Sequence, residues 1–400
     1  MEDRTHGREL LQKILFAVVL TMLAIVVVCT VLIVREGREP AVETEPGVII
    51  ISDETPAPQM TVNPQPTRPA GPCEHSWEGG VCTRCQERCP HLRHDAESRV
   101  CAVCGETVLH NYVGGQCTRC GSDAGLIDDI IDAGLAGGAT QHGKLEKLPY
   151  TYENESGVTV RKTLSVYVPY GYDSQEQYPV ALLIHGLGGK METWMEQSFS
   201  FGTIRVRGID VVDRLIEEHY IPPVLIVSIE TPGLSGSASY DLLVSRVSKE
   251  IRTGVLPTVC SQYSTFAKDS TPAGIAAARE HFAMIGASDG ALYTVESGLR
   301  DNRDLFGVYA PLSGLDIGEN ILAMQSSEWA KQYPIHLLYM GTGKTDFNRT
   351  QVLQAYIHML QADPRLIDGR NAFHHVCDSG HTFRSWFTDL ANVLQLAFPQ

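Results

Sequence analysis

Hydrophobic and polar residues follow different periods along the chain and divide it into six segments. Residues 14–34 form an unbroken run of apolar residues and threonines without charge, and about 20 such residues span a bilayer as a helix. Residues 35–72 are rich in proline, glutamate and threonine, which favours a disordered, extended stalk over a packed core. Residues 73–121 are rich in cysteine and histidine, and 122–143 form a linker with a short amphipathic helix expected at 126–135.

From residue 144 to residue 400, short β-branched and apolar runs alternate with helical patterns. This alternation predicts an α/β fold with a mostly parallel central sheet covered on both faces. The predicted strands are 160–168, 179–185, 224–229, 281–286, 306–310, 335–340 and 372–376.

The apolar run at 14–34 predicts an uncleaved transmembrane signal anchor. A secretory signal peptide has a shorter apolar stretch followed by a small-residue cleavage site, and this pattern is not found after residue 34; a cleaved signal remains the alternative. Residues 1–13 are then a cytoplasmic tail, and the long polar body lies outside the cell. We therefore expect a single-pass protein of the cell membrane with an extracellular catalytic domain.

Composition narrows the range of partners. The hydrophobic fraction of 43% is ample for a large core, and the net charge of −15 argues against a phosphate-binding surface, because such surfaces are basic. Nucleic acid is therefore not an expected partner, and the oligomeric state stays open.

The first chemical motif is Gly286-Ala-Ser-Asp-Gly290, which follows a strand-like run and precedes a helical one. It matches the G-x-S-x-G nucleophile elbow, in which small residues let the backbone turn sharply and expose the serine, here Ser288. A second strand ends in His185-Gly-Leu-Gly-Gly189. We expect the backbone amides of Leu187 and Asp289 to form the oxyanion hole and His185 to be structural.

Two later motifs supply the other members of a catalytic triad. Asp346 follows the predicted strand 335–340, and His381 lies between the last strand and the terminal helix. An acid holds the imidazole in the correct tautomer, and the imidazole acts as general base. His374 and His375 compete by residue type but lie within a strand pattern. The order Ser288, Asp346, His381 is the order of the α/β-hydrolase fold.

These motifs together resemble an esterase family of α/β-hydrolases that includes feruloyl and acetyl-xylan esterases. The resemblance covers residues 143–398 and rests on LSVYVP (164–169), HG (185–186), GASDG (286–290), PLSG (311–314), DF (346–347) and GHTF (380–383). It implies the triad Ser288, Asp346 and His381 and hydrolysis through an acyl-enzyme. Family members often carry Met-Gly-Gly after the serine, whereas this chain has Asp289, Gly290 and Ala291. A carboxylate so near an oxyanion is unfavourable unless it points away.

Eight of the 11 cysteines lie in the cysteine-histidine segment, in three repeats that resemble small zinc ribbons. Each C-x-x-C offers two thiolates, and zinc takes four tetrahedral ligands. The third repeat has three ligands and lacks a leading cysteine. Disulfides are the alternative, but histidines at a fixed offset have no role in them, so we expect structural zinc. The predicted ligands are Cys73, His75, Cys82 and Cys85, then Cys89, His91, Cys101 and Cys104, then His110, Cys117 and Cys120.

The sequence thus predicts a membrane-anchored extracellular serine esterase that acts on carboxylic esters, with acyl groups on polysaccharides as candidate substrates. No cofactor is expected for catalysis. An acyltransferase of the same fold and a non-catalytic surface protein with a hydrolase scaffold are the alternatives. Cys260 and Cys377 could pair as a disulfide or stay reduced.

Overall fold

The computed structural model of the chain describes residues 77–78, 81–83, 109–113, 115–118, 121–234, 237, 239–315 and 317–399. The predicted tail, anchor and stalk and most of the cysteine-histidine segment lie outside these residues. Within the described part of the chain, no helix combines the length and the apolar content needed to cross a bilayer.

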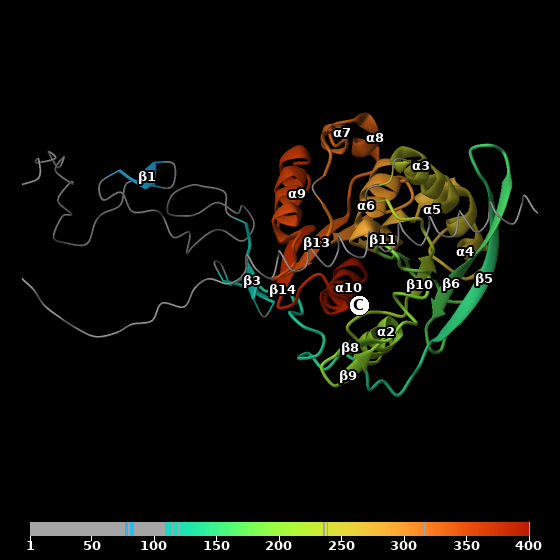
Figure 1. Ribbon diagram of the computed structural model, residues 1–400, viewed down its shortest axis with the longest axis horizontal. Helices are drawn as coiled ribbons and strands as arrows, with labels where there is room; N and C mark the ends of the chain where they lie inside the picture. Colours follow the sequence, from blue (N-terminus) through green and yellow to red (C-terminus); the bar gives the residue numbers. More distant parts are fainter. Residues whose placement is uncertain are drawn as a thin grey trace, which may run out of the picture. The chain divides into compact units, whose positions relative to one another are not determined.

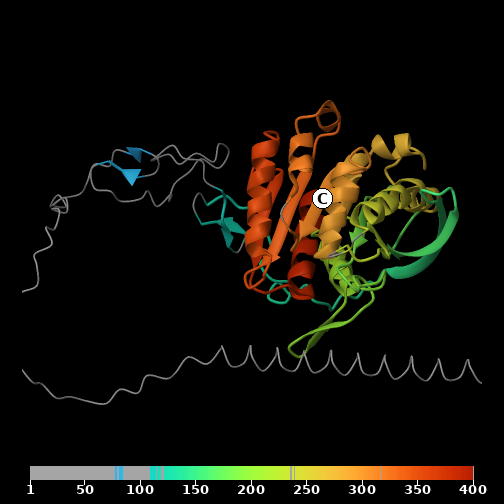
Figure 2. The same cartoon turned by 45° about the horizontal axis from the view of Figure 1, so that its top comes forward.

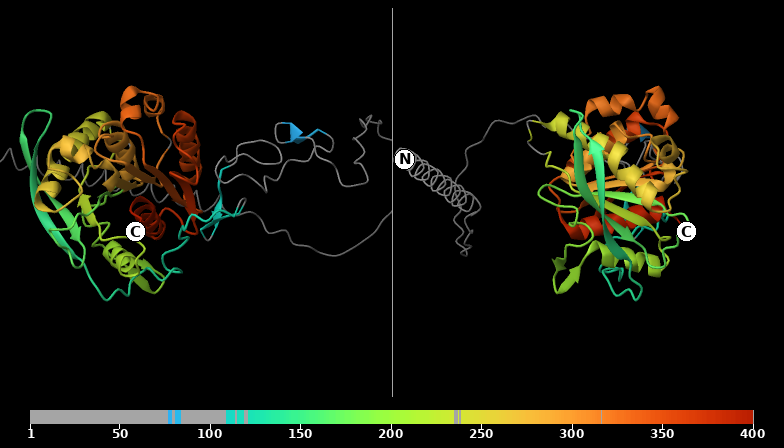
Figure 3. Two further views of the ribbon diagram at one scale, coloured as in Figure 1. Left: turned by 180° about the vertical axis from the view of Figure 1, so that it is seen from behind. Right: turned by 90° about the vertical axis from the view of Figure 1, so that its right-hand side faces the viewer.

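An eight-stranded mixed sheet forms the centre of the α/β domain, in the order β14-β13-β12-β11-β7-β10-β6-β5. The strands from β14 to β10 are parallel, β6 is antiparallel to β10, and β5 is antiparallel to β6. The long β5–β6 hairpin, green in Figure 3, closes one edge. The bounds are β5 (Lys144–Glu153), β6 (Thr159–Val168), β7 (Val180–Ile184), β10 (Leu225–Ile229), β11 (Phe282–Ala287), β12 (Val308–Leu312), β13 (Leu337–Gly343) and β14 (Ala372–Cys377).

The predicted α/β fold and all seven predicted strands are confirmed, with shifts of two or three residues at some ends. The prediction omitted β5, because Lys144, Lys147 and Pro149 interrupt its apolar pattern. An edge strand tolerates such residues, since one side of its backbone has no neighbouring strand. It also omitted the hairpin of β8 (Phe199–Phe201) and β9 (Ile204–Val206).

Helices connect the parallel strands, as the alternating sequence pattern predicts. The α-helices are α2 (Gly208–Glu217), α3 (Tyr240–Glu250), α4 (Leu256–Gln262), α5 (Pro272–Ala276), α6 (Asp289–Tyr293), α7 (Glu319–Met324), α8 (Glu328–Gln332), α9 (Arg349–Ala362) and α10 (Phe383–Ala397). Two π-helical segments, η1 (Ile251–Val255) and η3 (Thr294–Arg300), and a 3₁₀ turn, η2 (Arg279–His281), complete the set.

Alternate residues of the strands supply two hydrophobic cores, one on each face of the sheet. In β7, Leu182 belongs to the core shared with α3, η1, η3 and α9, whereas Leu183 belongs to the core shared with α2 and α10. Figures 1 and 2 show these two groups of helices covering the sheet. Because strand side chains alternate between faces, a fully apolar strand such as β7 must be covered on both sides.

The segment 122–143 packs against the α/β domain. Ile127, Ile130 and Leu135 are buried in the core on the α10 face, and Asn392 of α10 bonds the backbone N–H and C=O of Ile127. The helix expected at 126–135 is wrong, since these residues form a series of turns. Their apolar spacing reflects burial against α10.

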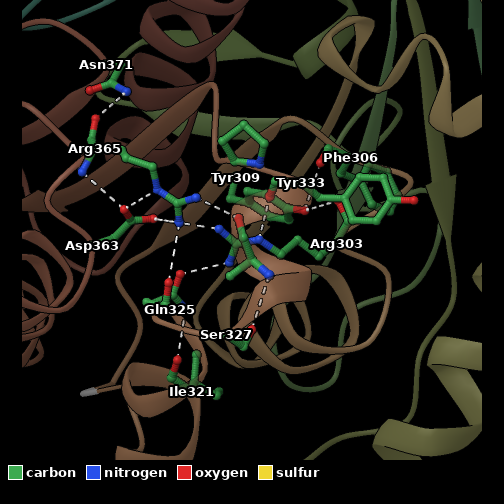
Figure 4. Close-up of polar contacts among 12 residues, drawn as sticks. Arg303, Phe306, Tyr309, Ile321, Gln325, Ser327, Tyr333, Asp363, Arg365 and Asn371 are labelled. Atoms are coloured by element: carbon green, nitrogen blue, oxygen red, sulfur yellow. Dashed lines mark hydrogen bonds and ion pairs between the residues drawn. The ribbon is translucent and has the colours of Figure 1, made fainter.

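A buried cluster of charged residues ties α7 and α8 to the rest of the domain (Figure 4). The Arg303 side chain is fully buried and donates to the Tyr333 carbonyl and to Gln325. Its guanidinium also lies 3.7 Å from Asp363, which receives two hydrogen bonds from Arg365. Burial lowers the pKa of Arg303 to about 10, so this ion cluster keeps its charge at neutral pH.

Candidate active site

Ser288 lies on the sharp turn between β11 and α6. Its φ of 57° and ψ of −118° lie in a region that residues other than glycine rarely adopt. A Cβ atom at Gly286 would lie 2.1 Å from the Gly290 carbonyl oxygen, and one at Gly290 would lie 2.4 Å from the Ile184 carbonyl oxygen. The two glycines of G-x-S-x-G are therefore required by close backbone approach, as the motif predicts.

The structure brings the three predicted triad residues together. Nε2 of His381 lies 3.0 Å from Oγ of Ser288, and Nδ1 of His381 lies 3.1 Å from each carboxylate oxygen of Asp346. Asp346 follows β13 and His381 follows β14, so all three residues lie at the carboxyl ends of parallel strands. With Nδ1–H donating to the carboxylate, Nε2 can accept the serine proton.

The surroundings of Asp346 favour its ionised form. Burial opposes ionisation, but hydrogen bonds from His381, Ser313 and the backbone N–H of Asn348 outweigh it and lower the pKa of Asp346. The Ser313 hydroxyl also accepts a hydrogen bond from Nε1 of Trp386 at 2.9 Å. Sequence reasoning missed Ser313, although it lies within the quoted PLSG motif; its φ of 49° cannot be read from residue type.

The end of β7, which precedes the predicted oxyanion-hole residue Leu187, lies directly beside Ser288. A Cβ atom at Gly186 would be 3.3 Å from Cβ of Ser288 and 3.8 Å from its hydroxyl, so the residue that follows, Leu187, is next to the nucleophile. Asp289 begins α6 on the other side. Its buried carboxylate accepts the backbone N–H of Leu234 at 2.5 Å, and this contact directs the carboxylate toward the loop after β10.

The other histidines of the motifs have structural surroundings. Nδ1 of His185 donates to the Gly186 carbonyl, and its Nε2 accepts the backbone N–H of Thr231. His374 is half-buried and His375 is buried in β14, and Nδ1 of His375 lies 3.5 Å from Asp389. Burial, with help from the charge of His375, lowers the pKa of His374 to about 4.

Two adjoining pockets of about 360 and 450 Å³ flank the triad and share Phe199 and Phe383. Leu187 lines one pocket and His381 lines the other, so the two pockets form a groove beside the predicted general base. The Phe199 and Phe383 rings stack with centroids 3.8 Å apart. The remaining lining residues are mostly polar: Gly188, Gly189, Lys190, Glu192, Thr193, Gln197, Ser200, Phe201, Ser379, Thr382, Arg384 and Trp386.

An apolar rim of three exposed residues lies at the edge of the sheet that carries the nucleophile. Leu187, Leu315 and Phe347 follow β7, β12 and β13, and their side chains are 65%, 47% and 72% exposed. Phe347 also stacks on the His381 ring at 4.3 Å. Exposed apolar side chains at one edge of a sheet are typical of a binding surface for an apolar group. Trp194 is buried in the core, and Tyr240 and Leu315 both line a smaller cavity of about 50 Å³.

The fold of the α/β domain is similar to those of solved esterases. No family model matches the chain. The feruloyl esterase module of Clostridium thermocellum, solved as a serine-to-alanine mutant complexed with sinapinate, superposes with a TM-score of 0.53 at 26% identity. The alignment covers 66% of this chain and 90% of that one. A structure designated FAE gives the same TM-score and coverage at 25% identity. The hydrolase domain has an esterase fold.

One relative is similar in sequence over part of the chain. Endo-1,4-beta-xylanase Y of Acetivibrio thermocellus is 33% identical over 174 residues. These residues make up 44% of this chain and 14% of the xylanase, so the chain spans a small part of that protein's length.

Most of the predicted metal ligands lie outside the described residues, namely Cys73, His75, Cys85, Cys89, His91, Cys101, Cys104 and Cys120. Cys82 lies in β2 (Val81–Cys82), which pairs with β1 (Trp77–Glu78). His110 and Cys117 are buried beside the esterase-fold domain, with Cys117 at the end of β4 (Gln116–Cys117). Among the residues the structure describes, no cluster of three or more histidine, cysteine or acidic side chains could hold a metal ion. Cys260 and Cys377 are not joined by a disulfide.

Proposed function

We propose that this chain is a serine carboxylic-ester hydrolase that works through an acyl-enzyme. The observation that carries the proposal is the chain of hydrogen bonds from the Ser288 hydroxyl through His381 to Asp346, with the serine held in a strained backbone conformation. This arrangement activates an otherwise weak nucleophile.

The reaction proceeds in two steps, acylation of Ser288 and hydrolysis of the acyl-enzyme. Nε2 of His381 takes the Ser288 proton as Oγ bonds to the ester carbonyl carbon, and the oxyanion forms near the backbone amides of Leu187 and Asp289. His381 then gives this proton to the departing alcohol, and the carbon–oxygen ester bond breaks. In the second half, water attacks the acyl-enzyme, His381 takes its proton, and the acid is released as Ser288 regains a hydrogen.

The lining of the groove favours as substrate an ester of a sugar with an aromatic or other apolar acyl group. The apolar rim of Leu187, Leu315 and Phe347 suits a flat apolar group. The polar residues of the groove, among them Gln197 and Arg384, suit hydroxyl groups of a carbohydrate. The esterase relative complexed with sinapinate and the xylanase relative support hydroxycinnamoyl esters of plant polysaccharides as the first substrates to test.

We further propose that the enzyme is tethered to the outer face of the cell membrane by residues 14–34, with residues 35–72 as a spacer. The support is the charge-free apolar run and the proline-rich composition that follows it. A tether would keep the hydrolase near the cell while the spacer lets it reach an extracellular polymer.

A panel of acetyl, feruloyl and longer-chain esters tests the activity, together with a fluorophosphonate probe that reacts with activated serines. The native chain should hydrolyse at least one ester and gain one probe adduct at Ser288. Ser288→Ala should lose both properties, and Ser326→Ala, which changes an exposed serine distant in sequence from the triad, should retain them. A native chain that neither labels nor hydrolyses any ester would favour a non-catalytic scaffold. Preferential transfer to an added acceptor alcohol over water would instead identify an acyltransferase.

A further inference from the structure

The segment 122–143 is bonded to one face of α10, and this contact fixes a side chain of the groove. Arg384, Thr388 and Asn392 follow one another at intervals of four residues, so they lie on the same face of the helix. Asn392 and Thr388 bond backbone groups of the segment. Nε of Arg384 donates to Oδ2 of Asp129 at 2.5 Å. The segment therefore holds the guanidinium at the start of α10.

Asp129 is itself held in place. Its side chain is 5% exposed, and its Oδ1 accepts the backbone N–H of Ile131 at 2.8 Å. Among the described residues, the guanidinium of Arg384 donates a hydrogen bond through Nε alone. A guanidinium has five N–H groups in a planar arrangement. Nη1 and Nη2 of Arg384 therefore keep donors that a bound ligand can use.

The position of Arg384 shows which part of an ester it would meet. Arg384 lines the pocket of about 450 Å³ that His381 also lines. In the proposed reaction His381 gives its proton to the departing alcohol, so the alcohol portion must lie on the His381 side of Ser288. This pocket therefore receives the alcohol portion of the substrate, and Arg384 borders it.

The groove carries an excess of positive charge, although the whole chain has a net charge of −15. Lys190, which is exposed, lines the adjoining pocket. Glu192 is the acidic residue among the described residues that line these two pockets, and it pairs with Lys147 at 3.1 Å. Cations of one sign in a concave site attract an anionic ligand.

We propose that Arg384 is a specificity-determining residue that binds a carboxylate on the alcohol portion of the ester, with Asp129 as its positioning residue. Since Nε is bonded to Asp129, Nη1 and Nη2 form a pair of donors that matches the two oxygens of a carboxylate. Sugar acids carry their charge as a carboxylate. The substrate class is therefore an acylated uronic acid unit of an acidic polysaccharide. This inference rests on the proposed ester hydrolysis.

Two esters that differ in one group test the proposal. The best acyl group of the ester panel is attached to a methyl glucoside and to the corresponding methyl glucuronoside, which has a carboxylate in place of the hydroxymethyl group. The native chain should show a kcat/KM about tenfold higher on the acidic ester, which corresponds to about 1.4 kcal/mol. This preference should weaken as salt is added, because Arg384 is partly exposed and its charge is screened.

Variants of Arg384 show whether the preference comes from this side chain. Arg384→Gln should bring the ratio of the two kcat/KM values to about one. Arg384→Lys keeps a cation against the buried Asp129 but lacks the paired donors, so it should also lose most of the preference. The control is Lys268→Gln, which removes an equal charge near the amino end of β7, where Thr265 bridges Tyr178. This control should keep the native ratio.

Asp129→Asn tests the positioning role. The amide still accepts backbone N–H groups but no longer pairs with the guanidinium, so the ratio should fall by roughly threefold. The inference is overturned if the native chain has the same kcat/KM on both esters, or if Arg384→Gln keeps the native ratio, which would leave Arg384 a structural role alone. An equal ratio in Asp129→Asn and the native chain would overturn the positioning role. Failure to hydrolyse either ester would refute the proposed function as well, whereas hydrolysis without preference would refute this inference alone.

Discussion

Ser313 connects the acid of the triad to the C-terminal helix, and its replacement by alanine is expected to weaken both stability and turnover. The hydroxyl bonds the Asp346 carboxylate and accepts Nε1–H of the buried Trp386. A hydrogen bond to a charged group contributes about 1.5–3 kcal/mol, and a buried N–H left without an acceptor costs about 1–3 kcal/mol. Since these effects overlap at one hydroxyl, Ser313→Ala should lower the free energy of unfolding by about 2 kcal/mol.

The catalytic effect follows from the same loss. Without the Ser313 hydroxyl, the Asp346 carboxylate is held less firmly against His381, and the imidazolium that forms in the transition state is less well stabilised. A loss of about 1.4 kcal/mol lowers kcat/KM about tenfold. Initial rates on the best ester of the panel, with urea unfolding on the same preparations, measure both quantities.

Ser313→Gly distinguishes the role of the Ser313 hydroxyl in positioning Asp346 from its contribution to the stability of the fold. Ser313 has a φ of 49°, and glycine adopts this left-handed conformation without the cost of roughly 1 kcal/mol that a Cβ carries. Ser313→Gly should therefore be about 1 kcal/mol more stable than Ser313→Ala, yet it should lose the same roughly tenfold in kcat/KM. If both variants turn over within twofold of the native chain, the assigned role of Ser313 is wrong.

Two further predictions concern buried charge. Burial opposes protonation of His375, but hydrogen bonds to Asp128 and Asp389 and their charges outweigh it and raise the pKa of His375 to about 9. The stability contributed by the protonated ring is therefore complete below about pH 6.5 and is lost as the pH rises to about 9. The free energy of unfolding, measured by urea titration, should fall by at most about 3 kcal/mol across this pH range. The fall should be smaller in Asp128→Asn. An equal pH dependence in the native protein and in Asp128→Asn would contradict the assignment. Asp363→Ala should lower the free energy of unfolding by about 3–5 kcal/mol, because it leaves the buried Arg303 without its ion pair. Lys331→Ala removes an exposed ion pair and should lower it by less than about 1 kcal/mol. Similar melting temperatures for these two variants would refute the argument.

The local chemistry of the site could be derived from the sequence. G-x-S-x-G places a serine between glycines, and the structure shows why, since a Cβ at Gly286 or Gly290 would meet backbone atoms. The apolar strands could be located because fully buried strands are continuous hydrophobic runs. The order Ser288, Asp346, His381 followed from the order of the strands that carry them.

Contacts between distant residues were decided by the tertiary structure. The direction of the Asp289 carboxylate depends on the Leu234 N–H, 55 positions away, and the role of Ser313 depends on Trp386. The burial of segment 122–143 against α10 and the His110–Asp368 contact likewise join residues more than 250 positions apart. A sequence pattern reports the periodicity and residue types of one segment, whereas the partner of a polar group is set by which strands and helices become neighbours once the core is packed.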